Sequence, residues 1–65
     1  MTITLNGSSA ETDATTVQTL LEELGLADKP VVIEHNETAL LKTEHETTTL
    51  ADGDSLEVIT LAAGG

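Results

Sequence analysis

Two kinds of residue in this sequence could carry chemistry: the glycine pair that closes it and its two histidines. The last five residues read Leu-Ala-Ala-Gly-Gly, so the sequence predicts a free carboxylate on Gly65. Glycine lacks Cβ and tolerates unusual backbone angles, so Gly64 and Gly65 could thread a narrow channel that a larger residue would block. A carboxylate is a poor electrophile until it is activated, for example by transfer onto AMP from ATP. The pattern predicts a macromolecular substrate whose reactive group is the Gly65 carboxylate.

The histidines give a weaker signal. A metal site needs three or four converging ligands, and neither His35 nor His45 has a carboxylate at helical spacing. His35 continues the inward alternation of Val31 and Ile33, so we expect it at the edge of the core. No nucleophilic triad and no glycine-rich loop before a helix is found in the sequence. We therefore expect no metal, no bound cofactor and no catalytic residues.

Composition excludes several classes of partner. The chain has no Phe, Trp or Tyr, so bases cannot stack on it, and 12 acidic against 2 basic residues give a net charge of −10. Nucleic acids and anionic membranes would be repelled, whereas a basic groove on a partner protein would attract the chain. Solubility or adaptation to salt is the alternative explanation. With no signal peptide and no membrane-spanning stretch, the expected location is the cytoplasm.

The elements that must position the carboxylate follow from hydrophobic spacing. Alternation over residues 1–5 predicts a strand, Asn6-Gly7 predicts a hairpin turn, and residues 8–12 form a second strand at a sheet edge. Thr15 is the expected N-cap of a helix, with Gln18 completing a capping box. Gly25 ends that helix, and Leu26 packs back on its last turn. The apolar stripe of the helix consists of Val17, Leu20, Leu21 and Leu24.

The second half of the chain completes the sheet. Residues 31–35 predict a buried strand, residues 38–42 a short one, and residues 43–50 an irregular segment with one tight helical turn. A turn at residues 52–54 precedes a final strand that points Leu56 and Val58 inward and Ile59 and Leu61 outward. The order ββαβββ predicts an α+β fold: a mixed sheet of five or four strands with one helix across one face. The first and last strands are expected to be central.

These features together resemble the ubiquitin-like β-grasp sulfur carriers, and within them the ThiS family of thiamine biosynthesis. The resemblance spans nearly the whole chain. Its most specific parts are "VIEHN" at residues 32–36 and "TTTLADGDSLEVITLAAGG" at residues 47–65. It implies a β-grasp domain over residues 1–61 and a flexible carrier tail over residues 62–65. The tail residues that enter a partner's active site would be Ala62, Ala63, Gly64 and Gly65.

The resemblance also implies a reaction and its partners. An E1-like adenylyltransferase would adenylate the Gly65 carboxylate with ATP, and a sulfur donor such as a cysteine desulfurase would supply sulfur for a thiocarboxylate. Thiazole synthase would then take the sulfur, so the chain is a co-substrate and not an enzyme. Family members dock through an apolar sheet surface, for which Ile59 and Leu61 are the candidates here.

The sequence departs from the family pattern at two places, and two alternative functions remain open. Leu41-Lys42 stands where the family commonly has Pro-Arg, and His45 stands where an aromatic residue is common. The carrier chemistry does not need these positions, so we expect the departures to affect the fit to the synthase and not the carrier role. One alternative is another β-grasp carrier, for molybdopterin or cysteine synthesis, or a protein modifier. The other is an interaction module whose terminal glycines are incidental.

Overall fold

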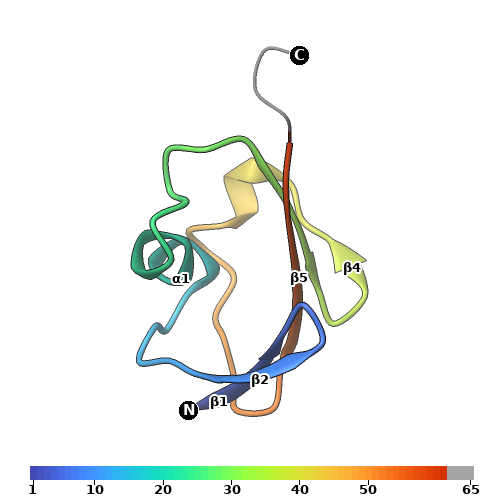
Figure 1. Cartoon of the computed structure of the whole chain (residues 1–65). Coiled ribbons are helices and arrows are strands. Elements are labelled where there is room, and N and C mark those ends of the chain that lie inside the picture. Colours follow the sequence, from blue (N-terminus) through green and yellow to red (C-terminus); the bar gives the residue numbers. More distant parts are fainter. Residues whose placement is uncertain (62–65) are drawn as a thin grey trace.

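The computed structural model describes residues 1–61, in which five strands form one mixed sheet that a single helix crosses (Figure 1). Along the sheet the strand order is β2-β1-β5-β3-β4, with β1 and β5 parallel and the other pairs antiparallel. This confirms the predicted α+β order, the central position of the first and last strands, and the edge position of the second. The elements are β1 (Thr2–Leu5), β2 (Ser8–Glu11), α1 (Val17–Glu23), β3 (Val31–His35), β4 (Thr38–Ala39), the 3₁₀ helix η1 (Lys42–Glu44) and β5 (Ser55–Thr60).

The hairpin between β1 and β2 turns at the predicted dipeptide. Asn6 and Gly7 both have positive φ, 50° and 83°, as a two-residue hairpin turn of this kind requires. Asn6 has a second role, because its side-chain Oδ1 accepts a hydrogen bond from the Val58 N–H at 2.7 Å. Its own N–H donates to the Leu56 carbonyl at 2.9 Å. The turn therefore also holds β5, a role that spacing alone does not reveal.

The N-cap of α1 is Thr16, so the prediction of Thr15 was wrong by one residue. The Thr16 hydroxyl accepts from the Thr19 N–H at 3.2 Å, and the Thr19 hydroxyl accepts from the Thr16 N–H at 3.0 Å. Thr19 thus completes the capping box in place of Gln18. The physical reason lies far away in the sequence. The Thr15 carbonyl accepts a hydrogen bond from the Leu50 N–H at 2.9 Å, which keeps Thr15 outside the helix.

The first turn of α1 is completed by carbonyls from the connection before β5. The first N–H groups of a helix have no partner inside it. Here the Val17 N–H donates to the Thr48 carbonyl at 3.0 Å, and the Gln18 N–H donates to the His45 carbonyl at 2.8 Å. These two bonds tie η1 and the segment after it to the start of the helix.

The other end of α1 stops as predicted at Gly25, with one correction. The Leu26 N–H donates to the Leu21 carbonyl at 2.8 Å and the Gly25 N–H to the Glu22 carbonyl at 3.1 Å, which is a Schellman motif. Gly25 has a φ of 74°, and Leu26 packs against the core. Leu24, predicted to lie on the buried stripe, is the C-cap and is 40% exposed. The helix ends at Glu23, so Leu24 does not belong to its buried face.

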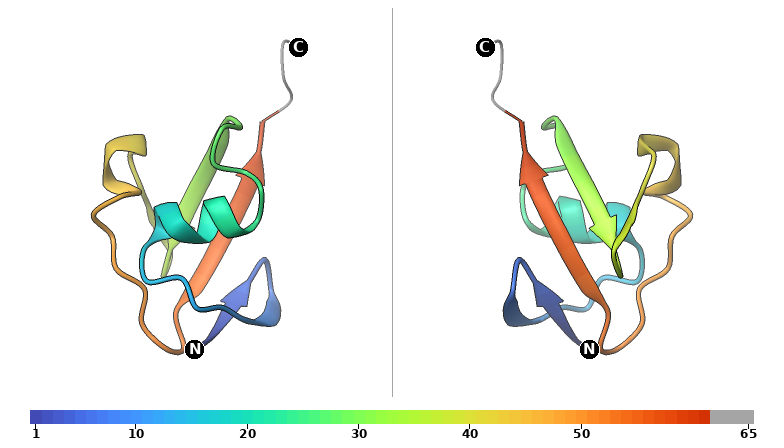
Figure 2. Two further views of the ribbon diagram at one scale, coloured as in Figure 1. Left: turned by 90° about the vertical axis from the view of Figure 1, so that its left-hand side faces the viewer. Right: turned by 90° about the vertical axis from the view of Figure 1, so that its right-hand side faces the viewer.

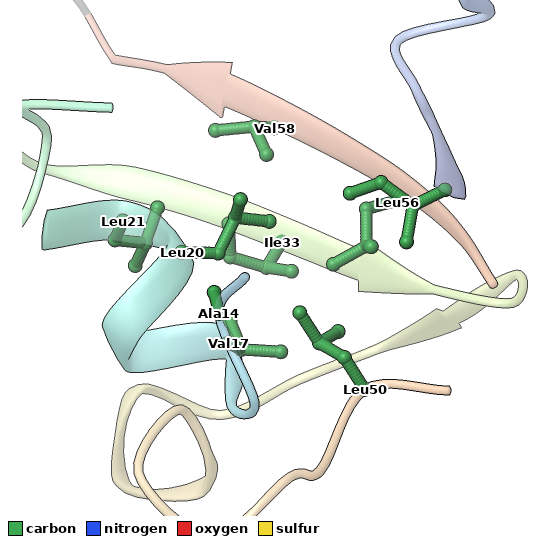
Figure 3. Close-up of a cluster of buried hydrophobic side chains, with 9 residues drawn as sticks. Ala14, Val17, Leu20, Leu21, Ile33, Leu50, Leu56 and Val58 are labelled. Atoms are coloured by element: carbon green, nitrogen blue, oxygen red, sulfur yellow. The ribbon is translucent and has the colours of Figure 1, made fainter. Parts of the chain in front are cut away.

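The core lies between α1 and the face of the sheet that the helix covers (Figures 2 and 3). It is entirely aliphatic, as the absence of aromatic residues requires. Leu20 and Leu21 from the helix face Ile33 and Val58 from the sheet, and Leu50 closes one end (Figure 3). The buried hydrophobic residues are Ile3, Ala14, Val17, Leu20, Leu21, Ile33, Leu50, Leu56 and Val58.

A histidine–aspartate pair joins the β3–β4 turn to the turn before β5. His35 Nε2 lies 2.7 Å from Asp54 Oδ2, which also accepts the Ala51 N–H at 2.9 Å. Asn36 Nδ2 donates to Asp54 Oδ1 at 3.2 Å. Burial alone would raise the pKa of Asp54, but the hydrogen bonds from His35, Ala51 and Asn36 outweigh it and hold that pKa below its ordinary value of 3.8. His35 lies at the core edge, as predicted.

Asp54 should therefore stabilise the fold at neutral pH and stop doing so in acid. A carboxyl whose pKa is lower in the folded state stabilises that state above its unfolded pKa, and the effect is lost as pH falls through the folded pKa. We expect the Asp54→Asn variant to be less stable than the parent at pH 6 and to approach it at pH 2. The measurement is the urea midpoint across that range. Asp28→Asn is the control, and a parallel loss in both variants would contradict the assignment.

Candidate functional site

The end of β5 is the described part of the chain nearest in sequence to the predicted carrier residues. Leu61, one residue beyond β5, donates its N–H to the Pro30 carbonyl at 2.8 Å. This bond pins the last described residue to the connection between α1 and β3. The same end of the molecule carries η1, whereas the turn before β5 lies at the opposite end with the N-terminus (Figure 1). The predicted carrier residues, Ala62, Ala63, Gly64 and Gly65, lie outside the described residues.

The outer face of the sheet, away from α1, presents apolar side chains near this end. Ile59 on β5 is 50% exposed, and its cross-strand partner on β3 is Val32, which is 39% exposed. Leu61, one residue beyond β5, is 51% exposed and borders a pocket on the helix side of the sheet, so the prediction that it points outward together with Ile59 was not accurate. Sequence analysis singled out Ile59 and Leu61 but missed Val32. The alternation of Val31 and Ile33 inward would have pointed to it.

Two glutamates continue the same face toward the start of β5. Glu34 and Glu57 are directly paired across β3 and β5, next to the pair formed by Val32 and Ile59. Like charges directly opposite each other in a sheet are unfavourable. The outer face therefore combines an apolar area with negative charge, which fits a partner surface that is apolar and basic.

The two histidines lie at opposite ends of β5. His35 belongs to the pair with Asp54 near the first residues of the strand. His45 is 4% exposed and borders a pocket that Leu61 also lines. Burial lowers the pKa of His45 below its ordinary value of 6.5, and the Lys42 ammonium lowers it further, while Glu44 raises it. His45 is thus a neutral imidazole at pH 7.

Neither histidine takes part in a metal cluster within the described part of the chain. Over residues 1–61, no group of three or more His, Asp or Glu side chains could hold a metal ion. No helix there is long and apolar enough to cross a membrane. The features that remain for function are the end of β5, the outer sheet face and the pocket beside Leu61.

Comparison with known proteins identifies the family. The model of the ThiS family matches residues 3–65. The sulfur carrier protein ThiS of Thermus thermophilus is 39% identical over 61 residues, which cover 94% of this chain and 95% of that protein. A thiazole synthase of Paramagnetospirillum magneticum is 33% identical over 66 residues. That match covers all of this chain but only 20% of the synthase.

Solved structures agree with the sequence relatives. The crystal structure of the thiamine biosynthesis protein ThiS from Geobacter metallireducens superposes with a TM-score of 0.83 at 32% identity, and each chain is covered in full. The solution structure of a thiamine biosynthesis protein from the same organism gives a TM-score of 0.81, with 88% of that chain covered. The five-stranded sheet with one helix is therefore the ubiquitin-like β-grasp fold. The chain belongs to the ThiS family, and it is a sulfur carrier of thiamine biosynthesis and not an enzyme.

Proposed function

We propose that the carrier group is the Gly65 carboxylate, which is converted to a thiocarboxylate. The observation that carries this proposal is the position of Leu61. The central strand β5 delivers Leu61 to one end of the molecule, and the last described hydrogen bond of the chain holds it there. The four residues that follow are small and lack any charged side chain, and the family match extends through Gly65.

The chemistry proceeds in two steps. A carboxylate oxygen attacks the α-phosphorus of ATP, pyrophosphate leaves, and an acyl adenylate forms. A sulfide sulfur then attacks the acyl carbon, and AMP leaves with the original oxygen. The product carries sulfur in place of one oxygen. We assign the first step to an E1-like adenylyltransferase and the supply of sulfur to a donor protein such as a cysteine desulfurase. The persulfide sulfur of such a donor is reduced to the sulfide level by two electrons from a thiol, which is oxidised to a disulfide. No cofactor needs to be bound by the carrier itself, and we place these reactions in the cytoplasm.

The proposed acceptor of the sulfur is thiazole synthase. A protein of that name contains a segment similar to this entire chain, which supports a working relation between a carrier domain and the synthase. Docking would use Ile59 and Val32 on the outer sheet face together with Leu61 at the end of β5, because these side chains are exposed beside the start of the carrier residues. The family match favours this role over molybdopterin or cysteine carriers, protein modifiers and a simple interaction module.

Intact mass is the test of the carrier group. Incubation with ATP, an E1-like adenylyltransferase and sulfide should raise the mass of the protein by about 16 Da, the difference between sulfur and oxygen. Deletion of Gly65 should abolish the gain and leave the urea midpoint unchanged, because it leaves the aliphatic core of residues 1–61 intact. An unchanged mass with an adenylyltransferase that is active on another carrier would refute the proposal.

A further inference from the structure

A pocket of about 230 Å³ opens beside Leu61, between α1, the α1–β3 connection and η1. Its apolar walls include Leu21, Val31 and Leu61, and its polar lining includes Lys29, Lys42 and His45. It lies on the helix side of the sheet, so it is distinct from the outer face around Ile59. The pocket combines an aliphatic interior with basic groups at the end of the molecule where the carrier residues begin.

The charge of this pocket is opposite to that of the rest of the chain. The sequence has 12 acidic residues, two lysines and no arginine. The two lysines, Lys29 and Lys42, both line the pocket. Within residues 1–61 neither lysine forms an ion pair, since the one ion pair there joins His35 and Asp54. Both lysine charges of the chain thus lie at one site, and no carboxylate of residues 1–61 forms an ion pair with either of them.

The walls of the pocket are held by backbone hydrogen bonds. The Gln18 N–H donates to the His45 carbonyl at 2.8 Å, which fixes η1 against α1. The Leu61 N–H donates to the Pro30 carbonyl at 2.8 Å, which fixes the end of β5 against the α1–β3 connection. A binding site that is already formed loses less conformational entropy when it is occupied.

We propose that this pocket receives an acidic side chain, Asp or Glu, of the protein that takes up the carrier's C-terminal residues. The methylene groups of such a side chain fit against Leu21 and Leu61, and its carboxylate fits the ammonium groups of Lys29 and Lys42. His45, a neutral imidazole, offers one further N–H donor. The inference rests on the proposed function, because the partner is the one proposed there.

The position of Leu61 is the reason to assign the acidic group to that partner. A protein that grips the residues after Leu61 must cover the rim of the pocket, because Leu61 forms part of its wall. The rest of the carrier surface attracts basic groups, so an acidic residue on the partner would be repelled everywhere else. The pocket would therefore fix the orientation in which the carrier docks.

A carrier variant with more negative charge distinguishes this contact from general electrostatic attraction, because the two explanations predict opposite changes in affinity. The Lys29→Met/Lys42→Met variant keeps the aliphatic stems and changes the net charge from −10 to −12, since two positive charges are removed. If the lysines act only through net charge, a more negative carrier should bind a basic partner faster and more tightly. If they contact an acidic side chain, the same variant should bind more weakly through faster dissociation.

The experiment measures association and dissociation rates with the thiazole synthase of the same organism. The control is Ser8→Glu/Ala51→Glu, which reaches the same net charge through exposed residues that do not line the pocket. We expect about tenfold weaker binding for the lysine variant, mainly through dissociation, and equal or tighter binding for the control. Equal affinities of the two variants would overturn the inference and leave the proposed function intact.

Two further outcomes are decisive. If wild-type carrier does not bind the synthase, the same comparison is made with the adenylyltransferase, and failure to bind either protein refutes the proposed function together with this inference. The other alternative is that the chain's own terminal carboxylate occupies the pocket. Conversion of the Gly65 carboxylate to an amide, which removes the charge and keeps the full chain, would then shift the amide NMR signals of Lys29, Lys42 and His45 in the free protein. Such a shift would overturn the assignment to a partner.

Discussion

Replacing Leu20 by alanine should lower the free energy of unfolding by about 2–5 kcal/mol, because it removes a buried side chain and leaves a cavity. Leu20 is 2% exposed and lies among the aliphatic residues between α1 and the sheet (Figure 3). A 65-residue domain has a total stability of roughly 3–10 kcal/mol at typical values per residue. The loss is therefore a large part of the total, and the variant should be partly unfolded at 37 °C.

Leu24→Ala is the matched control for this experiment. It removes the same side chain from the same helix, but Leu24 is 40% exposed at the C-cap. We expect it to lower the free energy of unfolding by less than about 1 kcal/mol. Urea denaturation followed by far-ultraviolet circular dichroism measures both variants. Equal losses would mean that the helix does not pack on the sheet through Leu20.

The loss of stability expected for Leu20→Ala is large because few interactions other than aliphatic packing stabilise this chain. It has no cysteine for a disulfide and no aromatic side chain, so burial of aliphatic groups must stabilise the fold. Its surface carries a net charge of −10, and mutual repulsion of these charges opposes folding. Added salt should therefore stabilise the protein, since it screens exposed charges at distances beyond about 10 Å.

Local patterns predicted the elements whose causes are local. The alternation around Ile3, the Asn6-Gly7 turn and the glycine after α1 each depend on a few neighbouring residues, and each was confirmed. The N-cap was wrong because its choice between Thr15 and Thr16 depends on Leu50, which is distant in the sequence. Sequence periodicity carries no information about a hydrogen bond of that kind.

The residues of the candidate site could be predicted only in part, because most of them come together through contacts between distant parts of the sequence. Exposure of Ile59 follows from alternation, but the pairing of Val32 with it depends on the register between β3 and β5. The pocket joins lysines at positions 29 and 42 with Leu61, and no short motif links them. Glu37 has a φ of 71°, an unfavourable value for a residue with a side chain, although sequence placed only the end of a strand there.

Replacing Ile59 by glutamate should impair the carrier far more than it destabilises the fold. Ile59 is half exposed on the outer sheet face opposite Val32, so a carboxylate there remains hydrated in the free protein. In a complex that covers this face, the same carboxylate would lose water against apolar groups. If Ile59 is at the centre of that interface, its loss costs about 2 kcal/mol, the value at which an interface residue counts as a hot spot, so we expect binding to the adenylyltransferase to weaken about 30-fold.

Leu24→Glu is the control that separates the effect of the added negative charge from the effect of placing it on the outer sheet face. It makes the same kind of change at a residue that is 40% exposed on α1, which packs on the opposite side of the sheet (Figure 2). General attraction to a basic partner would make both variants bind at least as well as wild type. Weaker binding of the Ile59 variant alone, with a free energy of unfolding within about 1 kcal/mol of wild type, assigns the loss to docking. If both variants bind as wild type does, the adenylyltransferase does not use this face of the sheet, and the carrier must be recognised through its terminal residues and the pocket beside Leu61.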